Sequence, residues 1–501
     1  MVLGAGPAGL AAAWRAARRG MSVVVLERSD SVGGMAASLD VAGVRVDRGS
    51  HRLHPTTSPR ILADLRMLLG DDLQLRRRNG RLRLADRWVA FPLRPAELVR
   101  ALPPGLIARA GADAILAPLR RRAAPVSYAD ALRRGLGPAL YDALYAPYAV
   151  KLWGRPGEKI DAEQARKRVA ADTPWKIASR MLRRRPGAAG RMFYYPRRGF
   201  GQIVEVLGDA AVKAGAEIRL DAEVDDIAPD SDGVDVGIAT WAPFVSDPAR
   251  APHAGIAGEA HSAGRAEPAS RLATSRDRGG VGPPMRVRAG HVFSTIPLPV
   301  LARISRPGPP AVAIESAARL RFRAMVLVYA VYAGRPWTPY DAHYLPGLDT
   351  PVTRISEPTN YRDSVSDPRD RTVLCYEIPC TVGDDIWTAT DDALREIITE
   401  TLARNGLPAV EPAGLHTERL SHVYPVYEIG YRRHLGGVDA WARTVPNVTT
   451  FGRLGLFVHD NTHHTLAMAY DAVDTLPAGD AFDLGAWAAA RARFESHVVE
   501  D

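Results

Sequence analysis

The feature that most constrains this chain of 501 residues is a group of three glycines close to its start. Gly4, Gly6 and Gly9 have the spacing G-x-G-x-x-G and follow the short apolar stretch 1–3. An alanine-rich stretch typical of a helix continues to about residue 20, and the β-branched run 22–26 is typical of a second strand. Because a strand, a glycine turn and a helix in this order let a backbone edge approach a pyrophosphate, the pattern predicts a dinucleotide site in an α/β fold.

Each part of this pattern has a physical reason. The first glycine permits the tight turn, the second lets the backbone approach the pyrophosphate, and the third lets helix and strand pack closely. The helix start offers N–H groups and the positive end of its dipole to phosphate oxygens. Glu27 closes the second strand, where a carboxylate is able to hydrogen-bond ribose hydroxyls. The first strand is either unusually short or begins upstream of Met1.

The overall composition is that of a globular protein with two or three packed cores. Hydrophobic residues make up 46% of the chain and charged residues 24%, which excludes a disordered, fibrous or disulfide-stapled chain. The chain has neither an apolar run of about 18 residues nor a secretory leader, so the expected location is the cytoplasm. Cys375 and Cys380 have the spacing of neither a metal cage nor a redox pair, so we expect both to be packing residues.

Positive charge is concentrated in residues 60–200. This stretch holds 30 Lys and Arg against 12 Asp and Glu, whereas the whole chain carries a formal charge of +9. Either a coding bias toward arginine produces this excess, or the stretch faces an anionic partner such as a phosphate-bearing substrate or an acidic membrane surface. The apolar segment 105–119, followed by Arg120–Arg122, is a candidate for peripheral membrane contact. Nucleic acid is not expected, because the basic runs lack interleaved aromatic residues.

A second motif follows the acidic residue. The doublet Gly33-Gly34 lies six residues beyond Glu27, and the segment VDRGSHRLH at 46–54 contains a D-x-G-x-H pattern that ends at His51. Together with the glycine turn, these residues resemble the flavoprotein superfamily of amine oxidases, protoporphyrinogen oxidases, carotenoid desaturases and UDP-galactopyranose mutases. The resemblance implies that the doublet lies along the FAD pyrophosphate and ribose and that the second segment runs beside the isoalloxazine ring. Met35 departs from the family pattern, because many of these oxidases have arginine there.

The resemblance recurs along nearly the whole chain. In its C-terminal block, it implies that Gly452, Arg453 and the helix that starts near His464 approach the flavin and its pyrophosphate, and it places the backbone near Val224 against the adenine. These relations favour FAD over NAD. The blocks, in family order, are WVAFPL (88–93), APYAVKLWGRP (146–156), FYYPRRGFGQI (193–203), VFSTIPL (292–298), EIPC (377–380), YPVY (424–427) and GRLGLFVHDNTHHTLAMAY (452–470).

The fold class implied is α/β: a Rossmann-like FAD-binding domain of the glutathione-reductase type, interleaved with an α+β substrate domain. The FAD-binding domain is expected from residues 1–60, 195–310 and 445–480, and the substrate domain from 61–194 and 311–444. Apolar spacings predict helices at 201–214 and 391–404 and a strand at 324–332, and the first part of the substrate domain reads as mostly helical. Residues 229–290, rich in Ala, Gly, Pro, Ser and Arg, predict a flexible insertion or, alternatively, an extra hairpin.

Three residues are candidates for catalysis. His51 would lie beside the flavin and accept or relay a proton, although a packing histidine is an equal alternative. Arg354 suits a carboxylate or phosphate through its planar fork, and its alternative is a salt bridge between domains. Tyr427 would bind a substrate phosphate or cover the flavin, unless it is a structural aromatic. We do not expect a metal at His459, His463 and His464, because neither a carboxylate pair nor a second histidine motif accompanies them.

Three functions are compatible with these patterns. The first is an FAD-dependent oxidoreductase that takes a hydride from a small organic substrate onto flavin N5. Since the chain has only one G-x-G-x-x-G, its electrons would pass to an external acceptor such as dioxygen, a quinone or a partner protein. The second is a redox-neutral nucleotide-sugar mutase that uses reduced FAD, although FVHDNTHH differs from the mutase pattern. The third is a non-catalytic flavin-binding interaction protein.

Overall fold

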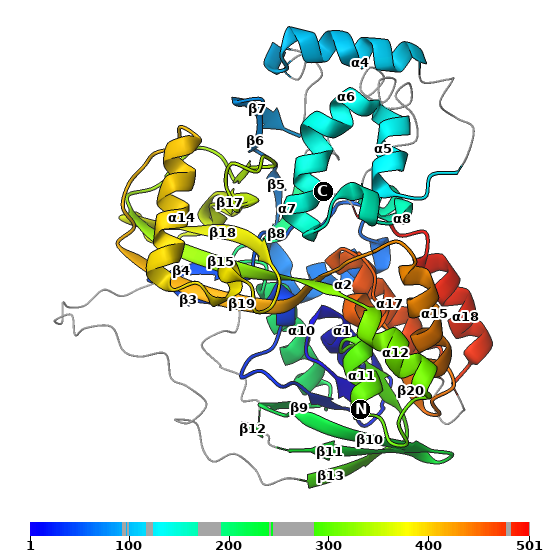
Figure 1. Cartoon of the computed structure of the whole chain (residues 1–501). Coiled ribbons are helices and arrows are strands. Elements are labelled where there is room, and N and C mark those ends of the chain that lie inside the picture. Colours follow the sequence, from blue (N-terminus) through cyan, green and yellow to red (C-terminus); the bar gives the residue numbers. More distant parts are fainter. Residues whose placement is uncertain are drawn as a thin grey trace, which may run out of the picture.

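The computed structural model describes residues 1–92, 97, 100–116, 124–168, 192–239, 242–243, 285–476 and 482–499. Two sheets organise these residues (Figure 1). A six-stranded sheet lies in the lower part of the molecule, near the N-terminus, and a seven-stranded sheet lies beside it at the left. The helices α4 to α8 lie above the six-stranded sheet.

The six-stranded sheet is assembled from three distant parts of the chain. Its order is β12-β9-β2-β1-β14-β20, and every pair is parallel except β12 with β9. The strands β2 and β1 occupy the centre, so the carboxyl end of β1 opens onto the middle of the sheet edge. Their bounds are β1 Val2–Leu3, β2 Val24–Leu26, β9 Glu217–Leu220, β12 Ala242–Pro243, β14 Val292–Ser294 and β20 Val448–Thr450.

The two faces of this sheet pack against different layers because successive side chains alternate. Val2 and Val25 lie in a core with the helices α1, α10 and α17, whereas Leu3 and Leu26 lie in a second core on the opposite face. The helix predicted at 201–214 is confirmed as α10. The helices are α1 Pro7–Arg18, α10 Gln202–Lys213 and α17 Thr462–Asp474 on the first face, and α11 Leu298–Ile304, α12 Ala311–Arg319 and α15 Tyr431–Ala442 on the second.

A three-stranded antiparallel sheet also covers the second face. It consists of β10 Val224–Asp230, β11 Gly233–Ile238 and β13 Met285–Ala289, in the order β10-β11-β13. The two ends of the segment 229–290 therefore match the alternative of an extra hairpin rather than a flexible insertion, and Val234 and Val236 of β11 are buried. Residues 240–241 and 244–284 of that insertion lie outside the described residues.

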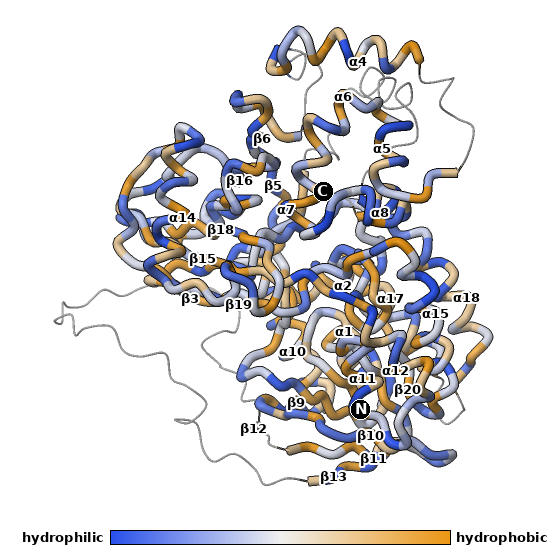
Figure 2. Tube along the Cα trace, viewed as in Figure 1, coloured by the Kyte–Doolittle hydropathy of each residue, from blue (hydrophilic) through white to orange (hydrophobic). Residues whose placement is uncertain are grey.

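The seven-stranded sheet has the order β19-β15-β18-β17-β16-β6-β7 and is antiparallel except between β16 and β6. Along β15, Val326 and Val328 face the helix α14, whereas Met325 and Leu327 face the opposite side. Figure 2 shows both hydrophilic and hydrophobic residues on α14, as expected for a helix with one buried face. The bounds are β6 Gly80–Leu84, β7 Arg87–Phe91, β15 Phe322–Ala333, β16 Ala342–Tyr344, β17 Arg354–Ser356, β18 Arg371–Cys380, β19 Gly414–Pro425 and α14 Asp391–Arg404.

Two sequence predictions in this region are confirmed: the strand at 324–332 lies within β15, and the helix at 391–404 is α14. Cys375 and Cys380 are both buried in β18 and form no disulfide, as expected for packing residues. The opposite side of the sheet from α14 meets a small hairpin of β3 Ser38–Val41 and β4 Val44–Asp47. This side faces the six-stranded sheet across the cavity described below.

The remaining segments complete the upper part of the molecule. The sequence indicated mainly helices between 61 and 194, and the structure adds strands there, since β6, β7 and the pair β5–β8 belong to this range. No helix among the described residues is both long enough and apolar enough to cross a membrane. Other bounds are α2 Pro59–Leu69, β5 Leu73–Arg77, α4 Pro104–Leu116, α5 Tyr128–Leu136, α6 Pro138–Leu140, α7 Ala146–Trp153, α8 Ala162–Arg168, β8 Met192–Pro196, α13 Asp385–Thr388, α16 Gly452–Gly455 and α18 Leu484–Phe494.

The segment considered for membrane contact, 105–119, coincides with α4 as far as Leu116. Ile115 and Leu116 are exposed at the end of this helix. Arg120–Arg122, which supplied the charge in that hypothesis, lie outside the described residues. Peripheral membrane contact therefore stays a prediction.

Candidate cofactor and substrate site

A single cavity of about 850 Å³ lies between the two large sheets. One end is formed by the glycine turn after β1 and by the start of α1, and the other by side chains of β15, β17, β18 and β19. The first residues of β10 and the segment that leads into α17 also line it. The volume lies in the upper part of the range for ligand pockets, and the position at the carboxyl ends of parallel strands is where such folds bind ligands.

The glycine turn allows an approach that side chains would prevent. Gly4 has φ of +96°, and a Cβ on it would lie 2.6 Å from Oγ1 of Thr295. A Cβ on Gly9 would lie 1.9 Å from the carbonyl oxygen of Gly4, so α1 packs directly on the turn. A Cβ on Gly6 would instead project into open space, and Gly6 lines the cavity just before α1 begins at Pro7. The turn at Gly4 and the close packing at Gly9 are therefore as expected, and Gly6 leaves open space at the cavity.

Glu27 lies at the end of β2 and also lines the cavity. Its Oε2 accepts a hydrogen bond from the backbone N–H of Ala5 at 2.7 Å, and its Oε1 accepts one from Ser29 at 3.0 Å. These two bonds join the end of β2 to the glycine turn and fix the carboxylate. The carboxylate is thereby held at the cavity wall.

The glycine doublet meets the glycine turn. The N–H of Gly33 donates to the carbonyl of Ala5 at 2.8 Å, and a Cβ on Gly34 would lie 3.5 Å from Cα of Gly6. Gly34 and Met35 line the cavity, whereas Gly33 lies behind it. Val224, at the start of β10, lines the cavity from the other side.

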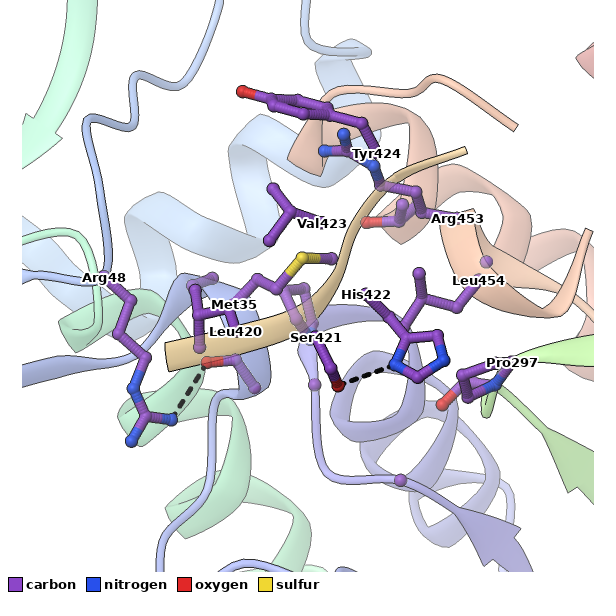
Figure 3. Close-up of a pocket in the computed structure, with 18 of the residues that line it drawn as sticks. Met35, Arg48, Pro297, Leu420, Ser421, His422, Val423, Tyr424, Arg453 and Leu454 are labelled. Carbon is purple, nitrogen blue, oxygen red and sulfur yellow. Dashed lines mark hydrogen bonds between the residues drawn. The ribbon is translucent and has the colours of Figure 1, made fainter. Parts of the chain in front are cut away.

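The C-terminal block closes against the same turn. Gly452 has φ of +80°, and a Cβ on it would lie 3.1 Å from Cβ of Ala8 in the first turn of α1. Arg453 lines the cavity with its guanidinium 5.0 Å from the ring centre of Tyr424, and Figure 3 shows the two side chains together. Burial lowers the pKa of Arg453 to about 10, and its Nε has no hydrogen-bond partner. A buried cation without a described carboxylate partner favours an anionic ligand.

His464 occupies a different position from the one expected. It lies in the first turn of α17, and its neighbours Asn461, Thr462 and Thr465 line the cavity, but His464 does not. Its ring points instead into a second cavity, where it stacks on His497. The start of α17 thus approaches the cavity through hydroxyl and amide side chains.

His51 lies in the cavity wall and stacks on Phe200, with ring centres 5.2 Å apart. Its Nε2 donates to the carbonyl of Arg48 at 2.9 Å, and burial lowers its pKa. The ring is therefore neutral near pH 7, with Nδ1 as the acceptor nitrogen. His54 lies on the other side of this segment, where its Nδ1 is 2.7 Å from Oγ1 of Thr56.

Arg354 lines the cavity and is held by a buried carboxylate. Its Nε and Nη2 donate to Glu377 at 2.9 and 2.7 Å, because the two residues are direct partners on β17 and β18. Burial would lower the pKa of Arg354, but the charge of Glu377 outweighs it and raises the pKa well above the usual value. The Oε1 of Glu377 also accepts the N–H of Ser50 at 2.8 Å, which ties this pair to the segment of His51.

Several lining residues were not identified from the sequence. Arg52 extends into the cavity with its guanidinium 4.7 Å from the ring centre of Tyr361 and 3.2 Å from Asp341. Tyr424 lines the cavity, and Oγ of Ser421 lies 2.8 Å from Nδ1 of His422, as Figure 3 shows. The sequence signal for Arg52 is its position directly after His51. Tyr424 lies in the short block YPVY, from which Tyr427 was selected instead.

Tyr427, the residue chosen from that block, does not line the cavity. It is buried in the second core, stacks on Tyr431 with ring centres 4.1 Å apart, and donates its hydroxyl hydrogen to the carbonyl of Phe457 at 3.2 Å. These contacts match the structural alternative. Its role in catalysis stays a prediction without support from its position.

Comparison with known proteins identifies the same fold. Residues 2–68 match the family model described as NAD(P)-binding Rossmann-like domain. No curated protein matches the chain. Similar solved structures include reduced UDP-galactopyranose mutase (17% identity, TM-score 0.73, 98% of this chain and 96% of the other). They also include the putative protoporphyrinogen oxidase from Exiguobacterium sp. 255-15 (18%, 0.67, 94% and 97%) and cyclohexylamine oxidase from Brevibacterium oxydans IH-35A (16%, 0.59, 94% and 98%).

The chain therefore has an α/β fold with a Rossmann-like domain, and it shares that fold over nearly its whole length with oxidases and a mutase. The sequence resemblance to the superfamily of amine oxidases, protoporphyrinogen oxidases and UDP-galactopyranose mutases is confirmed at this level. At these identities the comparisons identify the fold, and the reaction must be argued from the site.

Proposed function

We propose that this protein is an FAD-dependent oxidoreductase that oxidises a small, anionic organic substrate. The observation that carries the proposal is the single cavity that joins the glycine turn to the Arg354–Glu377 pair and to Arg453. A cofactor held at the turn and a substrate held at Arg453 would lie in one continuous space. Such an arrangement would bring the reacting atoms together.

The fit to FAD rests on the glycines. At Gly6 a Cβ would project into the cavity, and Gly34 and Gly452 make close backbone approaches on either side of the same turn. The start of α1 directs backbone N–H groups to this place, which suits a pyrophosphate. The residues that would hold FAD along the cavity are Gly4, Gly6, Glu27, Gly34, Met35, Val224 and Gly452. When bound, FAD supplies the hydride acceptor, N5 of its ring.

The chain's own residues would then bind the substrate and accept its proton. Arg453 attracts a carboxylate or phosphate, since it forms no ion pair with a described carboxylate. Arg354 is already neutralised by Glu377, so we assign it to positioning the cavity wall at Ser50 rather than to binding charge. His51, neutral and with Nδ1 as acceptor, is the group suited to take a proton from the substrate.

The decisive experiment is a spectrum followed by anaerobic mixing. Purified full-length protein is expected to carry flavin, or to take it up on reconstitution with FAD. Under nitrogen, members of a panel of amines, polyenes and porphyrinogens, including carboxylated ones, should decrease the absorbance of oxidised flavin, and air or a quinone should restore it. A protein that binds FAD but is reduced by no member of the panel would contradict an oxidoreductase.

A second candidate is a redox-neutral nucleotide-sugar mutase. It is favoured by the buried cation of Arg453 and by the match to reduced UDP-galactopyranose mutase over 98% of this chain. An arginine without a described carboxylate partner suits a diphosphate as well as a carboxylate. Conversion of a UDP- or GDP-sugar only after dithionite reduction, with no net oxidation, would decide for this candidate.

A further inference from the structure

A cluster of two histidines and an aspartate lies at the edge of the cofactor cavity, which Asp460 lines and the two histidines do not. Asp460 precedes α17, His464 lies in its first turn, and His497 follows α18 near the end of the described chain. Oδ1 of Asp460 is 3.3 Å from Nδ1 of His464 and 3.3 Å from Nδ1 of His497. The three donor atoms lie within 4.8 Å of one another.

These separations match those of ligands around one ion. Nitrogen and carboxylate oxygen atoms bound to zinc at about 2.0–2.1 Å in a tetrahedral arrangement lie about 3.3 Å apart. The imidazole rings of His464 and His497 stack with centres 4.2 Å apart, so both Nδ1 atoms face the same carboxylate. Each nitrogen therefore already lies at a tetrahedral spacing from the carboxylate oxygen, and the donor atoms all lie within 4.8 Å of one another.

The carboxylate lies close to both histidines. The side chain of Asp460 is 1% exposed; Nδ1 of His497 lies 3.4 Å from its Oδ2, and Nδ1 of His464 lies 3.3 Å from its Oδ1. These contacts are long, and a cation bound among the three groups would compensate the buried charge more fully. The N–H of Asn461 donates to Nδ1 of His464 at 3.3 Å, a long bond that an ion would replace.

A route for an ion and space for a water ligand lie beside the cluster. His464 and His497 line a second cavity of about 450 Å³, together with the hydroxyl-bearing residues Thr56, Ser58 and Ser496. This polar space can admit an ion and hold water beside it. His463 lines it as well, whereas His459 is packed against Trp153 and Tyr427.

The segment that carries His497 is fixed in place by α8. Nζ of Lys167 donates to the carbonyls of Glu495 and His497 at 2.7 and 2.8 Å, and the N–H of Val499 donates to the carbonyl of Lys167 at 2.9 Å. These contacts hold the C-terminal segment against α8. The histidine therefore reaches the cluster on an anchored piece of chain.

We propose that Asp460, His464 and His497 bind one divalent transition-metal ion of the Zn²⁺ kind, with water as the fourth ligand. Two imidazoles and one carboxylate form a donor set that zinc accepts. The ion ties the segment after α18 to the first turn of α17, whose residues Asn461, Thr462 and Thr465 line the cofactor cavity. The site is independent of the proposed oxidation. It also reverses the expectation from the sequence, which considered His464 without His497.

The test is zinc binding to the tag-free, full-length protein after treatment with a chelator. Calorimetric titration with ZnCl₂ should give one ion per chain, and the ion should raise the unfolding temperature. Asp460→Asn and His497→Ala should weaken binding at least about tenfold, since even outer partners of metal ligands have effects of that size. His434→Ala, on α15 and outside both cavities, is the matched control and should bind like the wild type.

Each other outcome counts against the site. Absence of zinc uptake by the wild type overturns the proposal, and so does equal uptake by His497→Ala and the control. If Asp460→Asn fails to fold, His497→Ala carries the test, because its flavin content and circular dichroism report whether the fold is intact. Loss of flavin chemistry with intact zinc binding would contradict the proposed function alone.

Discussion

The glycine turn offers the sharpest comparison, because two of its glycines face different surroundings. A Cβ on Gly9 would lie 1.9 Å from the carbonyl oxygen of Gly4 and 3.2 Å from Cγ1 of Val2. A Cβ on Gly6 would meet no atom within 4 Å. Gly9→Ala therefore strains the protein itself, whereas Gly6→Ala only occupies space at the cavity wall.

The size of each effect follows from these contacts. In Gly9→Ala, α1 must move away from β1 by more than 1 Å, judged from the roughly 3.0–3.4 Å of a normal contact, and overpacking of this kind costs about 1–3 kcal/mol. In Gly6→Ala, the stability of the flavin-free protein should stay within about 0.5 kcal/mol of the wild type. Its affinity for FAD should fall at least about tenfold, or roughly 1.4 kcal/mol, because the methyl group occupies the place of the pyrophosphate.

Two measurements separate the variants. Calorimetry of the flavin-free proteins should show a lower unfolding temperature for Gly9→Ala and an unchanged one for Gly6→Ala. Titration with FAD, followed by flavin fluorescence, should show weakened binding for both. Wild-type FAD affinity in Gly6→Ala would refute the placement of the pyrophosphate, and wild-type stability in Gly9→Ala would refute the packing of α1 on the turn.

Three further predictions concern buried charges. Glu377→Gln should destabilise the protein by about 3–5 kcal/mol, because it leaves Arg354 buried without its counter-charge. The control Glu400→Gln, in an exposed ion pair, should cost about 0.5 kcal/mol or less. Thermal unfolding measures both effects. Arg453→Met should leave the flavin-free protein as stable or more stable, since it removes a buried cation, and should raise the KM for an anionic substrate; an unchanged KM would exclude Arg453 from binding. Burial lowers the pKa of Lys151 to about 7, so the unfolded chain holds the extra proton between that pH and the usual lysine pKa of 10.5. Wild-type stability relative to Lys151→Met should therefore rise as the pH increases from 7 to 10, and a flat difference between the two unfolding curves would contradict it.

The sequence by itself determined the glycine turn and the strand and helix that flank it. These are local features. The spacing of Gly4, Gly6 and Gly9 sets backbone conformations and close approaches within a few residues, so the prediction of the turn does not depend on distant contacts. The helices at 202–213 and 391–404 are of the same kind, since an apolar stripe along one segment is enough to define them. In the small sheet, the strand at 233–238 belongs to the hairpin that was the alternative for 229–290, whereas the strand at 285–289 was missed, because it is short and pairs with 233–238 across a long separation in the chain.

Which side chains meet was decided only by the tertiary structure. Glu377 neutralises Arg354 because their strands are neighbours in register, a fact that neither strand contains alone. In the block YPVY, the irregular pairing of β19 with β15 between Leu420 and Tyr424 turns this part of the strand toward the cavity, and Tyr427 enters the core after the strand has ended. His497 joins Asp460 and His464 in the same way, through the return of α18 onto α17. The local sequence pattern determines the backbone conformation, but the contacts between charged groups and between the proposed metal ligands depend on how distant segments pack.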